Sequence, residues 1–130
     1  MSGWTDEELE RIGAAEELQL ASTRADGSVR PLVIMWVARV GDGLYVRSAY
    51  GADAGWYRRA VASGHGRIVA DGIERDARFA VVPAEPAAEV QEPLDAEYHR
   101  KYDRFGPAIV GTVVGPHRYD VTLRLDPLDG

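Results

Sequence analysis

The sequence predicts a mainly β protein, either a small antiparallel barrel or a sheet capped by short helices. Asp-Gly pairs at 26–27, 42–43 and 71–72 each lie between apolar-rich runs. Asp-Gly favours the positive φ angles of tight hairpin turns, so the flanking runs are expected to pair as antiparallel strands. Only a few short helices are indicated between them, which favours a sheet-based architecture.

Strands are expected at about 17–23, 28–40, 44–50, 67–71, 73–82 and 119–126. In the third of these, Leu44 and Val46 alternate with Tyr45 and Arg47, so one face is mainly apolar and Arg47 points to the other. Leu32–Val37 is apolar throughout, which is typical of a central strand buried on both faces.

Three helices are expected. Thr5 and Glu8 have the spacing of a capping box, and Trp4 can pack on Leu9 as a hydrophobic staple, so the first helix should run from there to about residue 13 or 15. The second should follow Gly55 and end near residue 63, before a Gly-His-Gly sequence. The third is expected at about 94–105, after an acidic, proline-spaced connector.

The composition indicates one domain, residues 1–130, with an ordinary soluble-protein hydrophobic content of 45%. The absence of cysteine excludes a disulfide framework and a thiolate nucleophile. The net charge of −6 argues against nucleic acid as a partner. No apolar stretch is long enough to span a membrane, and no signal-peptide pattern opens the chain, so we expect a cytoplasmic protein without a membrane partner.

The charges are unevenly distributed. Residues 24–67 contain seven arginines and three acidic residues, whereas the rest of the chain contains eight basic and 18 acidic residues. This difference in sign favours a local anion site, although solvated arginines on strand edges would give the same count.

Most catalytic and metal-binding motifs are missing. His65, His99 and His117 are far apart in the sequence and do not form a metal-ligand spacing, so we expect no metal site. No serine lies in a Gly-x-Ser-x-Gly elbow, and no Gly-x-Gly-x-x-Gly fingerprint occurs. The sequence assigns no catalytic residue.

The stretch LYVRSAYGADAGWYRRA, residues 44–60, predicts a site for a flat, anionic ligand. A helix that begins after Gly55 presents free amide groups, and Arg47 and Arg58 can flank a phosphate or carboxylate. Trp56 or Tyr57 can pack against a planar ring, or both can be core residues that attach the helix to the barrel. Arg59 is expected to point to solvent or to pair with an acid.

The order of several short motifs resembles known families. GLYVRS at 43–48, GADAGWYR at 51–58 and VADG at 69–72 resemble the deazaflavin-dependent nitroreductases over roughly residues 18–82. Lys-Tyr at 101–102 and Thr-Leu-Arg-Leu at 122–125 are similar to a small family named domain of unknown function 2255, and this resemblance covers almost the whole chain. Both groups belong with the pyridoxamine-phosphate-oxidase-like proteins.

The resemblance implies a fold and a cofactor site. The fold is a six-stranded antiparallel split β-barrel with short helices, of the FMN-binding type, usually a homodimer that binds a flavin or deazaflavin near the subunit interface. The residues that fall in the cofactor segment are Arg47, Ser48, Trp56 and Tyr57. Arg59 stands where the nitroreductases typically have Asn, and the turn at 24–28 lacks their lysine. The resemblance therefore leaves open how a phosphate tail is held.

The third helix is expected to line the substrate side. Tyr98, Lys101 and Tyr102 share one helical face, and the resemblance includes Lys101 and Tyr102. An amphipathic helix with a snorkelling Lys101 is the alternative. The apolar run at 108–114 has few charges for an exposed loop, which favours a homodimer.

The sequence is compatible with two functions. The first is an oxidoreductase, nitroreductase-like, that acts on a small molecule with coenzyme F-420 (a deazaflavin) or FMN. The second is a non-catalytic or cofactor-free protein that binds a small ligand in the same barrel. One fold hosts many functions, so the fold does not separate them.

Overall fold

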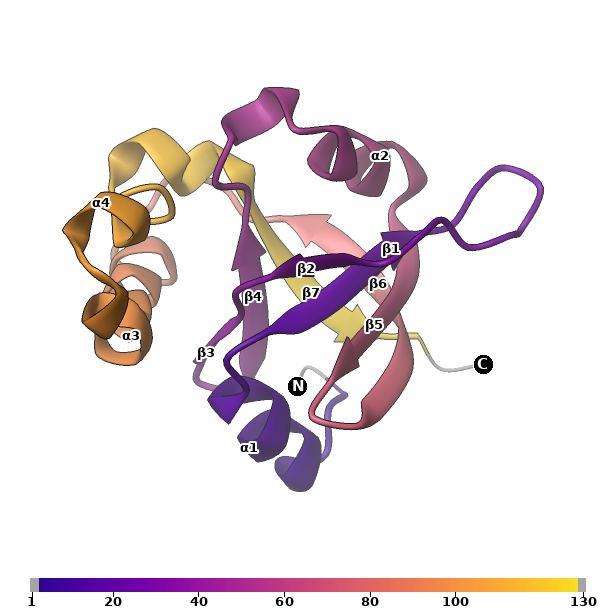
Figure 1. Cartoon of the computed structure of the whole chain (residues 1–130), viewed down its shortest axis with the longest axis horizontal. Helices are drawn as coiled ribbons and strands as arrows, with labels where there is room; N and C mark the ends of the chain where they lie inside the picture. The colour runs from indigo at the N-terminus through magenta and orange to yellow at the C-terminus, as the bar shows by residue number, and fades with distance from the viewer. Residues whose placement is uncertain (1–2, 129–130) are drawn as a thin grey trace.

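The computed structural model describes residues 3–128 as one curled antiparallel sheet with helices around it (Figure 1). Its strands, in spatial order, are β2 (Val33–Met35), β1 (Leu18–Ser22), β5 (His65–Ala70), β6 (Ile73–Val81), β7 (Thr122–Pro127), β4 (Gly43–Arg47) and β3 (Ala38–Val40). The fold is the expected split barrel, with seven strands instead of six because the run at 28–40 is divided into β2 and β3.

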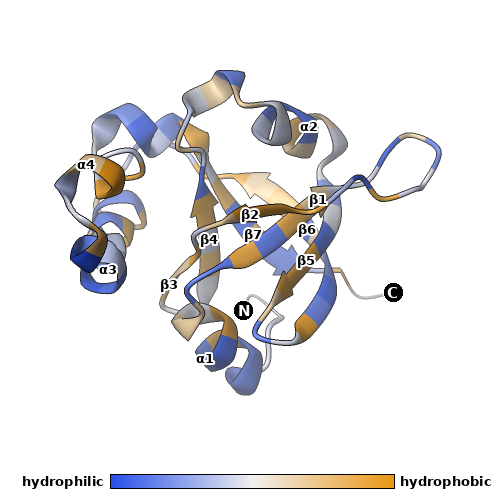
Figure 2. Cartoon of the chain, in the orientation of Figure 1, coloured by the Kyte–Doolittle hydropathy of each residue, from blue (hydrophilic) through white to orange (hydrophobic). Residues whose placement is uncertain are grey.

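The division at Trp36 and Val37 corrects one prediction. Leu32–Val37 was expected to be a central strand buried on both faces, but β2 and β3 are the two edge strands of the sheet. Ile34 is 58% exposed and Leu32 is 40% exposed. Figure 2 shows β2 in orange along its length, so this edge presents apolar side chains at the surface. The uniformly apolar run at 32–37 therefore corresponds to an exposed edge of the sheet, not to its middle.

Two helices pack at opposite ends of the barrel (Figure 1). α1 (Asp6–Ala14) begins with the expected capping box between Thr5 and Glu8, and the Trp4 indole donates a hydrogen bond of 2.9 Å to the Leu125 carbonyl. α2 (Gly55–Ser63) directs Tyr57 and Ala60 into the barrel core. It ends at Gly64, whose φ of 78° is a left-handed conformation that glycine adopts without strain.

The 3-10 helix η1 (Gly51–Asp53) lies between β4 and α2 in the chain. The other helices, which pack on the outer side of β3 and β4, are α3 (Gln91–Tyr102), the 3-10 helix η2 (Asp103–Phe105), α4 (Pro107–Val110) and the 3-10 helix η3 (Pro116–Val121). They bury a second apolar cluster that includes Tyr45, Leu94 and Tyr98. β4 therefore contacts the barrel core on one face and α3 on the other, and all five of its residues are buried. No helix within residues 3–128 is long and apolar enough to cross a membrane.

Hairpin turns form at or next to each Asp-Gly pair, although the turn between β3 and β4 is Gly41-Asp42 and Gly43 already belongs to β4. Between β5 and β6, Asp71 and Gly72 have φ angles of 51° and 76°, as a tight two-residue turn requires. At the start of β5 the sheet is unusually close-packed, because a Cβ atom on Gly66 would lie 1.8 Å from the Ala21 carbonyl oxygen of β1. Only glycine allows the two strands to approach this closely, next to the groove described below.

Candidate functional site: a basic groove beside α2

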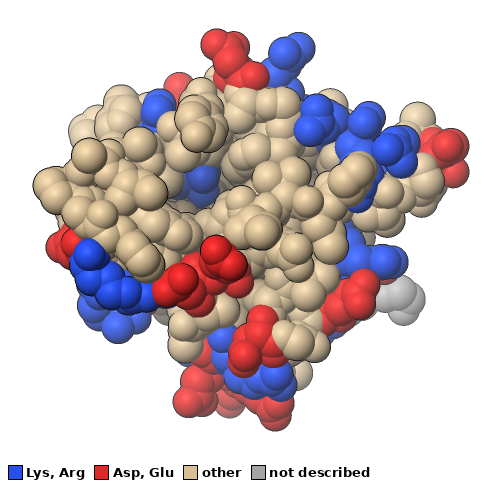
Figure 3. All heavy atoms as spheres, in the orientation of Figure 1, with Lys and Arg blue, Asp and Glu red and all other residues tan. Residues whose placement is uncertain are grey.

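A groove separates α2 from the connection between β1 and β2. It consists of an inner hollow of about 280 Å³ and an outer hollow of about 530 Å³. The outer hollow is within the size range of small-molecule sites, and the inner one is just below it. Arg30 and Arg59 line both hollows, so they lie where the two meet. Figure 3 shows Lys and Arg atoms gathered over this part of the surface, between α2 and the protruding loop.

The inner hollow has an apolar wall. Leu20, Pro31, Val33 and the partly buried Trp56 line it together with the two shared arginines. The Trp56 ring meets the Tyr57 ring edge-on, with centroids 5.8 Å apart. Tyr57 is buried in the barrel core, and Trp56 packs partly buried against the same core, so the Trp56 ring has a defined position beside the groove. An aromatic wall of this kind suits a planar ligand.

The outer hollow is polar and basic. Arg24 and His65 line it, and Thr23 and Ser63 add hydroxyl groups. Asp26 belongs to the same turn but does not line the hollow, because its carboxylate accepts hydrogen bonds from the Ser28 amide at 2.9 Å and the Ser28 hydroxyl at 2.7 Å. These contacts lower the pKa of Asp26. Within residues 3–128, no carboxylate lines either hollow.

Two arginines of the groove, Arg30 and Arg59, have no counter-ion among residues 3–128. Arg30 and Arg59 form no ion pair or side-chain hydrogen bond with any residue in the range 3–128, and the Arg30 Nε atom is buried without a hydrogen-bond partner. Elsewhere on the surface, Arg11 pairs with both Glu7 and Asp71. A buried donor without a partner costs free energy unless a ligand or water accepts from it.

Helical spacing explains which side chains of α2 reach the groove. Trp56, Arg59 and Ser63 follow one another at intervals of three and four, so they share a face of the helix. Tyr57 and Ala60 occupy the face that packs on the barrel, and Arg58 is left on the exposed side. The groove therefore contains Arg59, which the sequence ranked below Arg58.

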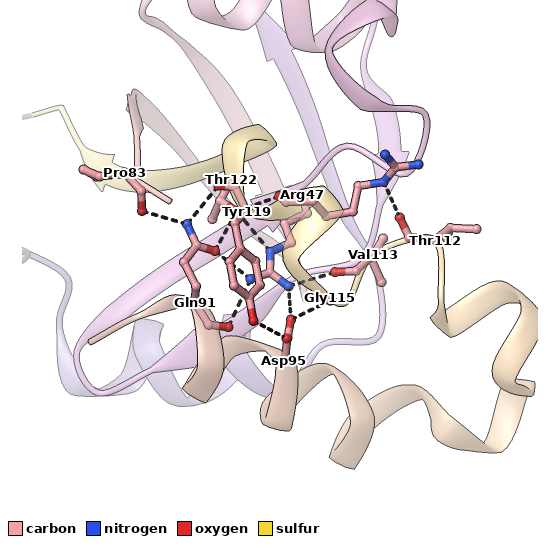
Figure 4. A network of polar contacts seen from close by, with 10 residues as sticks. Arg47, Pro83, Gln91, Asp95, Thr112, Val113, Gly115, Tyr119 and Thr122 are labelled. Atoms are coloured by element: carbon pink, nitrogen blue, oxygen red, sulfur yellow. Dashed lines mark hydrogen bonds and ion pairs between the residues drawn. The ribbon is translucent and has the colours of Figure 1, made fainter. Parts of the chain in front are cut away.

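Arg47 lies elsewhere, in the interior between β4 and α3 (Figure 4). Its side chain has no exposed surface, and all five N–H groups donate hydrogen bonds. The acceptors are Thr122 Oγ1, Asp95 Oδ1, the Val113 carbonyl, and the carbonyl and Oε1 of Gln91. Arg47 therefore points to the predicted face of its strand, but that face is buried too, and no donor remains for a ligand.

Other residues of the predicted site are also engaged in the fold. The Ser48 hydroxyl donates to the Gly51 carbonyl at 2.7 Å, and Ser48 is fully buried. The Tyr57 hydroxyl donates to the Asp120 carbonyl at 3.2 Å, and burial raises its pKa. Arg58 borders neither hollow. Of the residues expected to bind the cofactor, the structure brings only Trp56 to the groove.

The predicted substrate residues of α3 are buried in the second apolar cluster and do not line the groove. Lys101 Nζ donates to the Ala15 carbonyl at 2.7 Å and to the Val37 carbonyl, and burial lowers its pKa to about 8. The Tyr102 hydroxyl donates to the Glu16 carbonyl at 2.6 Å, while Trp36 stacks on its ring at 4.0 Å. Tyr98 is fully buried, and its hydroxyl finds no hydrogen-bond partner among residues 3–128.

Arg24 and Arg30 belong to the arginine-rich stretch that favoured an anion site, but neither they nor His65 were predicted as site residues. A usable signal was present, because Arg24 and Arg30 flank a predicted Asp-Gly turn and therefore lie at the base of the same hairpin. The close pairing of β1 with β5 then brings His65 beside them. Within residues 3–128, no three His, Asp or Glu side chains cluster as a metal site requires.

Comparison with known proteins gives the family. Residues 8–125 match the family described as "Uncharacterized protein conserved in bacteria (DUF2255)". The chain belongs to this family. The resemblance drawn from the motifs is thereby confirmed. No curated protein has a sequence significantly similar to the chain.

Solved structures show the same fold at low sequence identity. A Listeria innocua protein described as a pyridoxamine 5′-phosphate oxidase is 14% identical, with a TM-score of 0.64 over 95% of this chain and 93% of that one. An FAD-binding protein from Mesorhizobium loti is 19% identical, with a TM-score of 0.59 over 97% and 91%. An F-420 reductase is 21% identical, with a TM-score of 0.54 over 92% of each chain.

Proposed function

We propose that the protein is an oxidoreductase that binds a flavin-type cofactor, coenzyme F-420 or FMN, in the groove beside α2 and acts on a small molecule. The observation that carries the proposal is the pairing of an apolar wall at Trp56 with Arg30 and Arg59, which have no counter-ion among the described residues. Structures of similar fold that are titled as FAD-binding and as an F-420 reductase support this ligand class.

The residues of the groove fit such a cofactor. Trp56, Pro31 and Val33 offer a surface for the ring system, and Arg30 and Arg59 offer donors to a phosphate. Two charge-assisted hydrogen bonds of ~1.5–3 kcal/mol each give roughly millimolar to tens of micromolar affinity alone, so burial of the ring must supply the rest.

The residues that line the groove indicate what the chain does and what the cofactor does. Among the described residues, the ionisable side chains that line the inner hollow are arginines, and none is suited to general acid or base catalysis at neutral pH. A bound flavin or deazaflavin supplies hydride transfer. The chain then orients the ring on Trp56, holds the anionic tail, and excludes water from one face. No catalytic residue is needed to explain the arrangement.

We further propose a cytoplasmic homodimer. Leu32 and Ile34 at the β2 edge are exposed, as are Phe105 in η2 and Ile109 in α4. Figure 3 shows few charged atoms on this face between β2 and α4. β2 also borders the inner hollow through Val33, so a second subunit seated there would cover the open side of the ring site.

A titration tests the proposal. The purified protein is mixed with F-420 and with FMN, and binding is followed by cofactor fluorescence for the wild type, Arg59→Met and Arg58→Met. The loss of one charge-assisted contact should weaken binding about ten- to a hundred-fold in Arg59→Met. Arg58→Met removes the same charge one residue away and should bind within about two-fold of the wild type.

Two outcomes would contradict the proposal. Equal losses in both variants would place the anion outside the groove. Failure of the wild type to bind either cofactor at millimolar concentration would exclude a flavin-type site. If a cofactor binds, oxidation of its reduced form by a panel of nitro and quinone acceptors separates an oxidoreductase from the alternative, a protein that binds without catalysis.

A further inference from the structure

The outer face of the sheet carries a separate polar hollow, formed by β4, β6, β7 and the turn before β4. Its volume is about 500 Å³, which is within the range of small-molecule sites. The strand register explains the cluster, because Tyr45 lies opposite Arg124 and Asp126 lies opposite Arg78, so these side chains share one face of the sheet. The lining residues, none of which lines the groove beside α2, are Asp42, Gly43, Tyr45, Arg78, Arg124, Asp126 and Pro127.

Tyr45 brings a hydroxyl group without a partner to this hollow. The residue is 6% exposed and its ring packs in the second apolar cluster, but the hydroxyl forms no hydrogen bond with any residue in the range 3–128. A Cβ atom on Gly43 would lie 2.7 Å from the hydroxyl oxygen, so the glycine leaves room for the hydroxyl at the edge of the hollow. Burial raises the pKa of Tyr45, so the hydroxyl keeps its proton at neutral pH and can donate. A mostly buried donor costs free energy unless a ligand or water accepts from it.

Arg78 brings an unpaired cation to the same hollow. Other arginines of this face are paired, Arg67 with Glu74 at 3.3 Å and Arg124 with Asp126 at 2.9 Å. Arg78 lies opposite Asp126 in the register, but Arg124 already engages that carboxylate. Arg78 forms no ion pair or side-chain hydrogen bond with any residue that the structure describes, so its guanidinium donors are available to a ligand.

We propose that the hollow is a binding site for a zwitterionic amino acid. Arg78 and the Tyr45 hydroxyl donate to the carboxylate of the ligand, and Asp42 accepts from its ammonium group. Asp42 is exposed and has no ion-pair partner between residues 3 and 128. The charged side chains that line the hollow are two arginines and two aspartates, so their charges cancel. A dianion or a dication therefore gains little net attraction there, whereas a zwitterion meets both signs.

Amide chemical shifts of the ¹⁵N-labelled protein test the site, with glycine, L-alanine and 4-aminobutyrate as probes. Acetate and ethylamine, which carry one charge each, are the ligand controls. At least one amino acid should shift amides within residues 42–46, 76–79 and 123–127, with the millimolar affinity expected of a few charge-assisted contacts. It should bind about ten-fold or more tightly than either control, because each control makes only one of the two ionic contacts.

Three variants separate a ligand site from a charged surface. Arg78→Met removes the unpaired cation and should weaken binding about ten-fold or more. Tyr45→Phe removes only the hydroxyl and should weaken binding about three- to ten-fold without lowering the free energy of unfolding, because that hydroxyl has no partner among the described residues. Arg67→Met removes a paired arginine of the same face, outside the hollow, and should bind within about two-fold of the wild type.

Several results would overturn the proposal. These are failure of all three amino acids to bind at tens of millimolar, largest shifts outside the hollow, or equal losses in Arg78→Met and Arg67→Met. Binding of acetate as tight as that of the amino acids would exclude the contact with Asp42. The inference does not depend on the flavin-type cofactor, so saturation with F-420 or FMN should leave the amino-acid affinity unchanged, and failure of one proposal leaves the other standing.

Discussion

Arg47 shows how a charged side chain becomes a structural residue. The guanidinium joins β4 to α3, η3 and the segment after α4, and it lies over the rings of Tyr98 and Tyr119 at 5.6 and 5.2 Å from their centroids. Asp95 balances its charge and also accepts from the Tyr119 hydroxyl at 2.8 Å. Burial and this carboxylate raise the pKa of Tyr119 to about 12.

The Arg47→Met variant should therefore unfold more easily than the wild type. The change leaves Asp95 without its cation and several buried acceptors without donors, at an expected cost of about 3–5 kcal/mol in the free energy of unfolding. Urea denaturation measures this cost, with Arg58→Met as the control, expected within about 0.5 kcal/mol of the wild type. A stable Arg47→Met protein that loses cofactor affinity would show that Arg47 binds the ligand.

At the scale of elements, α3 is attached to the barrel by a buried lysine. Lys101 reaches two main-chain carbonyls, that of Ala15 after α1 and that of Val37 between β2 and β3. Lys101 therefore connects α3 to the segment that follows α1 and to the segment between β2 and β3. The side chain is only 9% exposed, which explains why its pKa falls from the usual 10.5 to about 8.

This burial predicts a pH dependence of stability. Between pH 8 and 10 the folded protein has largely lost the Lys101 proton while the unfolded chain still holds it, so the free energy of unfolding should rise with pH. The difference between the wild type and Lys101→Met should increase across this window, by at most about 1.4 kcal/mol per pH unit. Urea denaturation at pH 8, 9 and 10 measures it. A constant difference would show that Lys101 titrates normally.

The elements also show what sequence patterns can and cannot predict. The capping box at Thr5, the hairpin at Asp71-Gly72 and the α2 boundaries were predicted correctly, because each depends on local chemistry. The exposure of Ile34 and the burial of Arg47 depend on which elements pack against each strand. The alternation of apolar and polar residues along one strand does not contain that information. The fold was therefore largely predictable from the sequence. Prediction of the groove would have required knowing that β1 pairs with β5.

At the scale of the whole molecule, the apolar face around β2 predicts a dimer. Sedimentation at micromolar concentration should give twice the chain mass of 14.2 kDa. Ile34→Glu places a charge on the exposed β2 edge and should produce a monomer. Val81→Glu changes a similarly exposed valine of β6 and should leave the dimer intact. A monomeric wild type, or two variants that behave alike, would contradict the assignment of this face.

The central claim is that a flat, anionic cofactor lies between α2 and the connection of β1 to β2. Mapping of amide chemical shifts in the ¹⁵N-labelled protein during titration with F-420 or FMN tests this location most directly. If the cofactor lies in the groove, the largest changes should fall within residues 20–33 and 55–65, which line or border it. Largest changes along α3, at Tyr98, Lys101 and Tyr102, or around Arg47, would contradict it.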